Sequence, residues 1–450
     1  MSTTSLPSYV APSLARIPSY SAEPHAYEQR LALNRLRAPP AGDFVKQSRG
    51  GSVSLRLIEQ EDNASLPMYG CGAAVEGTVD LAKTDGVTTV EVKIEGTLRL
   101  KEIAEGGTTT NSLCLSKVVL WSKDRDAGPC PLSLPFSLTL PTTFSDGKDN
   151  YPLPPTHEAH LSGVPGFKAA IDYSVSATVH KSRATSLLRL GNSSVSTPFI
   201  YYPRSRPATP IPRPLSPIHG TSHFLATPDW KCYECRMKAQ IMGGKDIKSS
   251  LYLPTSRVFC ISQPIPFHIT FSSSAFSLAA FMPYGPTASI LAPNKQFTQI
   301  KLLRQSTVDV RNALVLGTKT DIWSVVNIGE GVFSHAGDGS DWISFVGEIR
   351  VHDQIKVGGF KAGGFSIKVC PSPCRLYPTL HDTPEPAKAP FGELRQVIPV
   401  RLTTDPWSDD GMLPANFSAS PTPPEEAQGL HPSYSRTRWP YEGLGVRGAM

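Results

Sequence analysis

The stretch that decides the fold is Thr89–Lys101, which reads TVEVKIEGTLRLK. Apolar residues and Gly96 occupy every second position from Val90 to Leu100, while charged residues and Thr97 occupy the positions between them. This period of two predicts a long β-strand with one apolar face and one charged face. Such a strand belongs to an antiparallel sheet that covers a core from one side, because parallel strands are usually buried on both faces. We therefore expect an all-β chain built from β-sandwiches.

Length and composition narrow this expectation. A chain of 450 residues exceeds the size at which one hydrophobic core stops growing, so two domains are expected. The net charge of +6 is small and no Lys/Arg run occurs, which disfavours nucleic-acid binding and fits a mildly basic surface near an anionic membrane. The eight cysteines are scattered and the first residues lack an apolar signal core, so we expect a cytoplasmic protein with reduced thiols.

Alternating patterns bounded by turn residues predict strands in two parts of the chain. In the first part these are Ser52–Ile58, Ala74–Ala82, Val87–Ile103, Cys114–Trp121, Leu134–Leu140 and Phe167–Val179. In the second part they are Pro266–Phe271, Ser277–Phe281, Phe297–Leu303, Thr307–Leu316, Asp321–Val326 and Trp342–Val351. The one candidate for an amphipathic helix, Glu28–Arg37, lies ahead of the first domain and is short enough to be marginal on its own.

The prolines predict the boundaries between folded and unfolded segments. Residues 1–43 and 403–450 are expected to be disordered tails, residues 44–195 and 230–402 to be the two β domains, and residues 196–229 to be a Pro-rich linker. Repeated proline removes backbone donors, so we expect this linker to be extended, exposed and unpaired.

Ser-Pro and Thr-Pro pairs fall in the segments expected to be exposed. They place candidate phosphorylation sites at Thr209 and Ser216, where a phosphate would lie among the arginines of the linker. The arginines are Arg204, Arg206 and Arg213, and the other Ser/Thr-Pro positions are Thr197, Thr227, Thr383, Ser420 and Thr422.

Several motifs occur in an order that resembles the N-terminal domain of arrestin-fold proteins, most closely a fungal branch of the α-arrestins. They are YGCGAAVEGTVDL at Tyr69–Leu81, the long strand ending in IEGTLRL, LPFSLTLP at Leu134–Pro141 and IDYSVSA at Ile171–Ala177. The position of the C-terminal arrestin domain is taken by LYLPTSRVFCISQPIPFH at Leu251–His268, WISFVGEIRV at Trp342–Val351 and ELRQVIPV at Glu393–Val400.

The resemblance covers residues 44–402 and implies two tandem immunoglobulin-like sandwiches of the arrestin type. The chain departs from the family pattern after Val369, where the sequence CPSPCRLYPTL at Cys370–Leu380 is too rich in proline for a central strand.

The tripeptide Pro-Ser-Tyr occurs three times, always outside the expected domains. WW domains bind PPxY-type peptides because a polyproline II turn lies against an aromatic groove while the tyrosine fills a second pocket. In the α-arrestin family such motifs recruit HECT ubiquitin ligases, and LPSY fits a variant in which leucine replaces the first proline. Ordinary Pro- and Ser-rich disorder is the alternative explanation. The candidate ligase-binding residues are Leu6, Pro7, Tyr9, Pro18, Tyr20, Pro432 and Tyr434.

The motifs expected of an enzyme are incomplete. The sequence HEAH at His157–His160 is one residue short of the spacing that places two metal-binding histidines on one helix face. Gly243-Gly244-Lys245 lacks the flanking residues of a phosphate-binding loop. Two cysteine pairs, Cys232/Cys235 and Cys370/Cys374, could supply four zinc ligands, but i and i+3 side chains face opposite sides of a strand. We therefore expect no enzyme activity, metal or cofactor.

The resemblance implies a non-catalytic adaptor. Such a protein binds the cytosolic regions of membrane transporters or receptors and brings a WW-domain HECT ubiquitin ligase to them for ubiquitin-dependent endocytosis and sorting. It would be cytoplasmic, with recruitment to the plasma membrane or endosomes. A retromer-like trafficking scaffold without ligase recruitment, or a sandwich-fold DNA-binding protein, are the alternatives that the sequence leaves open.

Overall fold

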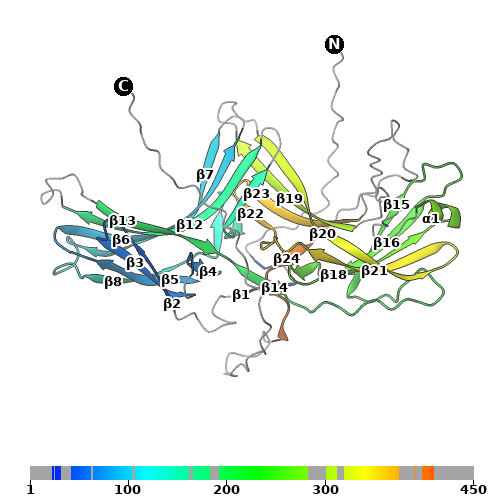
Figure 1. Ribbon diagram of the computed structural model, residues 1–450, viewed down its shortest axis with the longest axis horizontal. Helices are drawn as coiled ribbons and strands as arrows, with labels where there is room; N and C mark the ends of the chain where they lie inside the picture. The colour runs from blue at the N-terminus through cyan, green and yellow to red at the C-terminus, as the bar shows by residue number, and fades with distance from the viewer. Residues whose placement is uncertain are drawn as a thin grey trace, which may run out of the picture. The chain divides into compact units, whose positions relative to one another are not determined.

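The computed structural model describes residues 23–24, 26–31, 42–61, 64–103, 107–161, 166–182, 192–281, 300–311, 319–373, 391 and 398–409. The described residues as far as Trp407 belong to one compact unit. The described residues are mostly β-strand, with one short helix, so the all-β expectation is confirmed (Figure 1).

The first part of the chain forms two sheets around a shared core, and their strands are antiparallel except for one short parallel pair at an edge. One sheet has the order β2 (Gly42–Gln47), β3 (Val53–Gln60), β5 (Ala74–Leu81) and β8 (Ser133–Thr139). The other has the order β4 (Met68–Tyr69), β13 (Asn192–Tyr201), β12 (Phe167–Lys181), β6 (Val87–Glu102) and β7 (Thr108–Ser122), with β11 (His157–Leu161) also pairing with β12. Both sheets bury residues in one hydrophobic cluster, which gives this part the character of a β-sandwich.

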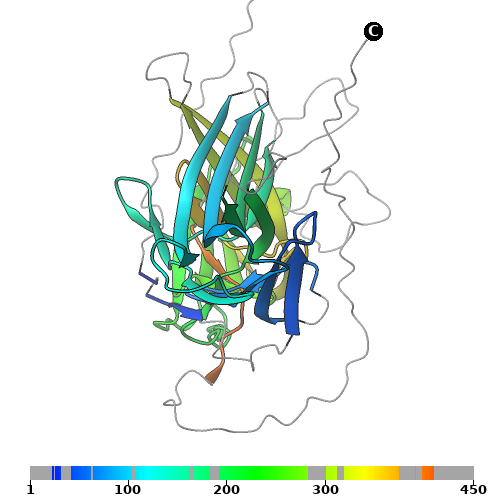
Figure 2. The same ribbon diagram turned by 90° about the vertical axis from the view of Figure 1, so that its left-hand side faces the viewer.

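The long strand predicted from period two is β6, which runs beside β7 in Figure 2. Val90, Val92, Ile94 and Leu98 are fully buried, which confirms the predicted apolar face. The other face carries ion pairs, among them Lys93 Nζ to Glu95 Oε2 at 2.7 Å. Alternation along the sequence therefore decided which side of this sheet faces the core.

The second part forms a third sheet of eight strands around its own cluster. The order is β15 (Trp230–Met237), β16 (Ile247–Pro254), β18 (Ile265–Ser272), β21 (Trp342–Val351), β20 (Lys319–Asp338), β19 (Ile300–Arg311), β23 (Phe365–Pro373) and β22 (Phe360–Ala362). The helix α1 (Ala275–Phe281) contributes Leu278 and Phe281 to this core. The far edge of the sheet instead completes the first core, to which it adds Val308, Phe360, Ala362, Phe365 and Ile367.

Three short strand pairs complete the described fold. They are β9 (Thr143–Ser145) with β10 (Asn150–Pro152), β1 (Glu28–Leu31) with β14 (Arg204–Pro207), and the parallel pair of β17 (Val258–Cys260) with β24 (Arg401–Thr403).

Three secondary-structure expectations were wrong. The expected helix at Glu28–Arg37 begins instead as strand β1, because pairing with β14 outweighs a marginal helical pattern. The expected strand at Ser277–Phe281 is part of α1, whose sequence AFSLAAF favours helix and whose Ser277 N–H donates to Ser274 Oγ at 3.3 Å, as at a helix N-terminus. The two strands expected around residues 297–316 are one strand, β19, over its described length.

Part of the Pro-rich linker, which was expected to be unpaired, is strand. The stretch after Val369 was expected not to be a central strand, and from Cys370 to Pro373 the strand β23 pairs with β19 alone among the described strands. Residues 196–201 complete β13, residues 204–207 form β14, and β23 continues through Pro371 to Pro373. Strand β4 pairs with only the last two residues of β13. Strand β22 pairs with β23 only as far as Ile367. Most of each Pro-containing stretch is paired on one side only. Proline is tolerated there because the unpaired side does not need the backbone N–H that proline lacks.

A glycine in the middle of β6 makes room for a buried tyrosine. A Cβ atom at Gly96 would lie 2.5 Å from the Tyr173 ring and 2.8 Å from Cys114 Sγ. Tyr173 cannot easily move, because it is buried and its hydroxyl donates to the Pro154 carbonyl at 2.6 Å.

We expect Gly96→Ala to destabilise the protein by about 1–3 kcal/mol through overpacking against this ring. Gly50→Ala is the matched control, because nothing lies within 4 Å of a Cβ at Gly50. Urea unfolding followed by tryptophan fluorescence measures both variants. Equal unfolding midpoints for the two variants would show that the close approach at Gly96 has no energetic consequence.

Candidate functional site

Segments from the beginning, middle and end of the described chain meet at β1, β14 and β24. Strand β1 pairs with β14 from Glu28↔Pro207 to Leu31↔Arg204, and β24 also contacts β14. We call the polar residues that join these strands the polar clamp. Its members are Glu28, Gln29, Arg204, Ser205, Arg206, Arg401, Thr404 and Asp405.

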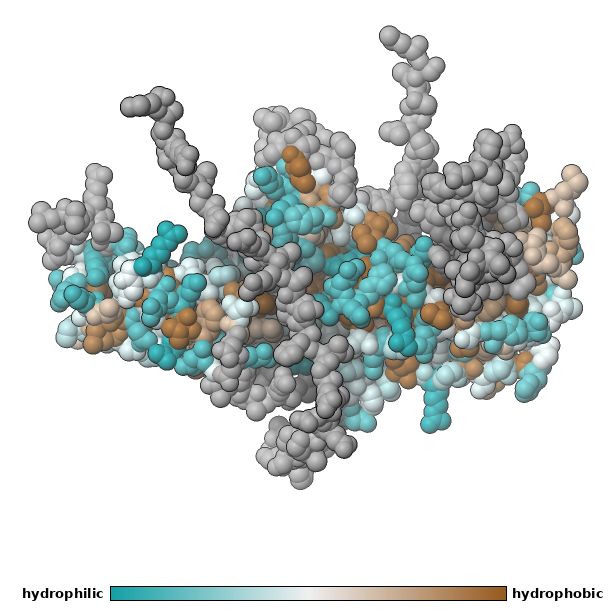
Figure 3. All heavy atoms as spheres, viewed as in Figure 1, coloured by the Kyte–Doolittle hydropathy of each residue, from teal (hydrophilic) through white to brown (hydrophobic). Residues whose placement is uncertain are grey.

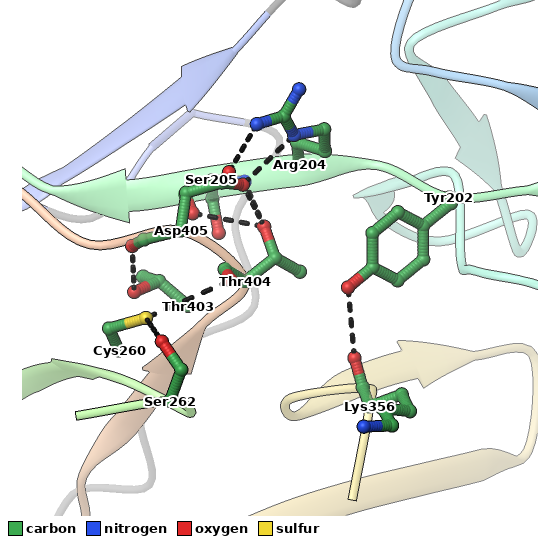
Figure 4. A network of polar contacts seen from close by, with 9 residues as sticks. All are labelled: Tyr202, Arg204, Ser205, Cys260, Ser262, Lys356, Thr403, Thr404 and Asp405. Atoms are coloured by element: carbon green, nitrogen blue, oxygen red, sulfur yellow. Dashed lines mark hydrogen bonds and ion pairs between the residues drawn. The ribbon is translucent and has the colours of Figure 1, made fainter. Parts of the chain in front are cut away.

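A bidentate ion pair between Arg204 and Asp405 lies at the centre of the clamp (Figure 4). Arg204 Nε lies 3.0 Å from Asp405 Oδ2, and Arg204 Nη2 contacts Oδ1. Thr404 continues the connection, because Ser205 N–H donates to Thr404 Oγ1 at 2.9 Å. Burial acts to raise the pKa of Asp405, but hydrogen bonds from Arg204 and Thr404 outweigh it and the net pKa is lowered. Asp405 is therefore held as a carboxylate.

A second ion pair in the clamp is more deeply buried. Arg401 Nε lies 2.7 Å from Glu28 Oε2, and the Glu28 side chain is 3% exposed. Next to it, Arg206 Nε donates to Gln29 Oε1 at 2.9 Å. The buried Arg206 and the partly buried Arg401 thus contact polar groups of β1, a segment that sequence analysis assigned to the disordered tail. Breaking such a pair is costly because a charge remains buried without its partner.

A cavity of about 90 Å³ adjoins the clamp. Its wall includes the clamp residues Glu28, Arg204 and Arg401, and also Arg30, Tyr201 and Lys361. The wall therefore carries four cationic side chains and one carboxylate.

His157 lies where the first core meets the far edge of the third sheet. Its ring centroid is 5.4 Å from that of Phe360 and 6.2 Å from that of Phe365, while its Nε2 lies 3.5 Å from Arg304 Nη2. Burial, with a smaller effect of Arg304, lowers the pKa of His157 to about 4. His157 is consequently neutral at physiological pH and serves as an aromatic packing group.

The histidines of the HEAH sequence do not share a face. Both lie on β11, where His157 is partly buried and His160 is exposed, with its Nε2 3.1 Å from Glu158 Oε1. Along the chain that the structure describes, no group of three or more His, Cys, Asp or Glu side chains is arranged to hold a metal.

The first cysteine pair lies on strand β15, as the sequence predicted. Cys232 is exposed and Cys235 is partly buried, and both are free thiols. Cys370 lies in β23 without a described side chain, and Cys374 lies outside the described residues. The helical structure that the described ranges contain is too short or too polar to cross a membrane.

The two candidate phosphorylation sites, Thr209 and Ser216, are both exposed. The expectation that the linker arginines surround them needs correction, because Arg204 is paired with Asp405 and Arg206 is buried against Gln29. Arg213 is the exposed one of the three. Thr197 was expected to be exposed, but it is buried in β13.

The candidate ligase-binding residues Leu6, Pro7, Tyr9, Pro18, Tyr20, Pro432 and Tyr434 lie outside the described residues. Sequence reasoning missed the polar clamp entirely. The charged residues of the clamp are visible in the sequence beside short alternating segments. Nothing in the sequence, however, indicated that Glu28 and Arg401 would form an ion pair.

No known protein family and no curated protein matches this chain.

We expect Asp405→Asn to destabilise the protein by about 1–3 kcal/mol, because the half-buried Arg204 loses its charged partner. The matched control is Glu348→Gln, which breaks an exposed pair with Arg350 and should cost less than about 0.5 kcal/mol. Urea unfolding at pH 7 compares the two. A cost for Asp405→Asn no larger than that of the control would mean that the clamp does not stabilise the fold.

His157 should make stability depend on pH. The unfolded chain binds a proton near pH ~6.5, whereas the folded protein resists protonation until about pH 4. Above pH ~6.5 the neutral His157 costs the fold nothing. As the pH falls, protonation of the unfolded chain lowers the free energy of unfolding, and this loss reaches about 2 kcal/mol at pH 5. Urea midpoints at pH 7 and pH 5 should differ less for His157→Gln than for wild type. An equal decrease in both would assign the acid sensitivity to other groups, such as the buried His268 that both proteins retain.

Proposed function

We propose that this chain is a non-catalytic adaptor of the arrestin type. Two tandem immunoglobulin-like sandwiches would bind the cytosolic part of a membrane transporter or receptor. The terminal Pro-Ser-Tyr motifs would bring a WW-domain HECT ubiquitin ligase to that cargo, leading to ubiquitin-dependent endocytosis and sorting. The protein would act in the cytoplasm and be recruited to the plasma membrane or endosomes.

The arrangement of the cores supports the two-sandwich part of the proposal. One hydrophobic cluster lies mainly between the four-stranded sheet and the sheet of β6 and β12. The other is formed mainly by side chains of the eight-stranded sheet. Strands β1 and β14 and the polar clamp join the segments between these clusters. A protein of this kind offers broad sheet faces and end loops to a partner, which suits binding.

The connector in this proposal is shorter than the Pro-rich linker expected from sequence. Residues 196–201 and 204–207 belong to paired strands, so the stretch between the two groups of sheets is residues 208–229. It contains Thr209 and Ser216, and their exposure fits the proposal that phosphorylation regulates the adaptor.

The observation that carries ligase recruitment is the occurrence of three identical Pro-Ser-Tyr sequences outside the sandwich sequence. A retromer-like scaffold would share the same sheets and would not need these motifs. A DNA-binding sandwich is less favoured, because the basic residues on the outer face of β6 and β7 are matched by carboxylates. The pairs are Lys93–Glu95, Arg99–Asp172 and Lys117–Glu91. The visible face in Figure 3 likewise mixes hydrophilic with hydrophobic residues.

The proposal is tested by binding of a ligase WW domain to a peptide covering residues 2–12. We expect a micromolar dissociation constant, about −7 to −8 kcal/mol, which Tyr9→Ala weakens at least tenfold by emptying the tyrosine pocket. Ser8→Ala is the matched control at the variable position of the motif and should bind as the original peptide does.

In the full-length protein, changing Tyr9, Tyr20 and Tyr434 together to alanine should abolish co-purification with the ligase and leave the unfolding temperature unchanged. Wild-type recovery of the ligase with this triple variant would favour the retromer-like scaffold.

A further inference from the structure

The connector between the two groups of sheets begins with a proline at every second position. Residues 209–214 read TPIPRP, and we call them the proline segment. Every residue in it is either a proline, whose ring fixes φ at about −65°, or the residue before a proline, which is kept out of the helical region. None of these residues belongs to a helix or a strand. The restrictions favour polyproline II, an extended helix with three residues per turn and no internal hydrogen bonds.

Both ends of the proline segment are anchored to the fold. On one side, the Ala208 N–H donates to the Tyr27 carbonyl at 2.8 Å, which extends the pairing of β1 with β14. On the other side, Leu215 is buried and its N–H donates to His268 Nε2 at 3.2 Å. His268 is a buried residue of β18, so this anchor is part of the eight-stranded sheet. The segment is therefore held extended between two fixed points.

The proline segment presents two of its three edges to solvent. Residues three apart lie on the same edge of a polyproline II helix. Pro212 and Leu215 share the edge that faces the protein, because Leu215 is buried and Pro212 is partly buried. The described residues donate no hydrogen bond to the carbonyls of residues 210–212, so these acceptors are free for a partner. The exposed residues of the other two edges are Pro210, Ile211, Arg213 and Pro214.

Arg213 supplies the charge of this surface. Its carbonyl accepts a hydrogen bond from Trp230 Nε1–H at 2.9 Å, which fixes the backbone while the side chain remains exposed. Arg204 and Arg206, by contrast, contact polar side chains of the clamp. Among the carboxylates that the structure describes, none forms an ion pair with Arg213. An exposed guanidinium on a fixed backbone fits a carboxylate of a partner, which it can bind through two parallel hydrogen bonds.

We propose that the proline segment is the docking site for a partner domain of the SH3 type, with an aromatic-lined groove for polyproline II and a carboxylate beside that groove. Such grooves recognise the preformed conformation of a Pro-rich segment. Ile211 and Pro214 would lie in the groove, and Arg213 would pair with the carboxylate. Because both ends are anchored, the segment in the intact protein should bind more tightly than the same sequence in a free peptide. This site is separate from the Pro-Ser-Tyr motifs and does not depend on ligase recruitment.

The test uses the full-length protein with Tyr9, Tyr20 and Tyr434 changed to alanine, so that the tail motifs cannot contribute. It is presented to a panel of purified SH3 domains, and isothermal titration calorimetry gives the dissociation constants of those that bind. We expect at least one domain to bind with a micromolar dissociation constant. A peptide covering residues 207–216 should bind the same domain about threefold or more weakly, because the free peptide loses more conformational entropy on binding.

Two variants of this protein test the role of individual side chains. Arg213→Ala should weaken binding about tenfold or more by removing a charge-assisted contact. Pro214→Ala should weaken it about fivefold or more by emptying part of the groove and loosening the extended conformation. Both side chains are exposed, so the unfolding temperature should not change. Arg49→Ala, at an exposed arginine between β2 and β3, is the matched control and should bind as the parent protein does.

Three results would overturn the proposal. The first is that no SH3 domain of the panel binds, and the second is an equal effect of Arg213→Ala and Arg49→Ala on the dissociation constant. The third is tighter binding by the peptide than by the protein, which would show that the proline segment is not accessible in the folded chain.

Discussion

The ion pair between Arg204 and Asp405 connects parts of the chain that are far apart in sequence. Arg204 belongs to β14, which pairs with β1, and Asp405 follows β24, which pairs with β17. Four segments are thereby held at one place through side chains whose charges are partly removed from water. Such an arrangement stabilises only if each charge keeps its partner, because desolvation of an unpaired ion exceeds the gain from any neighbouring contact. The position of β14, and with it the course of the chain between the cores, depends on this pairing.

Hydrophobic burial and polar pairing have separate roles in this fold. Burial determines which face of each long strand points inward, as Ile94 and Lys93 show by occupying opposite sides of β6. It also ties the far edge of the eight-stranded sheet to the first part of the chain, because Phe365 and Ile367 of that sheet pack into the first core. The register of the meeting strands is specified instead by directional contacts such as Ser205 N–H to Thr404 Oγ1.

The sequence predicted the strands with clear alternation and missed the others, among them β13, most of β20 and the short strands β1 and β14. Period two over many residues specifies both strand and face, so β6, β12 and β21 were located within two residues of their bounds. Strands β1 and β14 have four residues each and depend on one another, so neither carries a detectable pattern. Proline was given too much weight, because its effect depends on whether a neighbouring strand needs the missing donor, and neighbours are a property of the fold. The candidate site was missed for the same reason.

Burial shifts the pKa of ionisable side chains so that their neutral forms are favoured. Each neutral side chain is then accommodated by its own contacts. Tyr173 is buried, and its hydroxyl is satisfied by the Pro154 carbonyl, so it completes the core. His157 is neutral and packs between aromatic rings. Tyr201 is equally buried, and burial, followed by the neighbouring Cys71 thiol, raises its pKa far above the usual value. Because folded proteins pair nearly all of their buried polar groups, the contact made by each buried hydroxyl or imidazole is part of what fixes the packing around it.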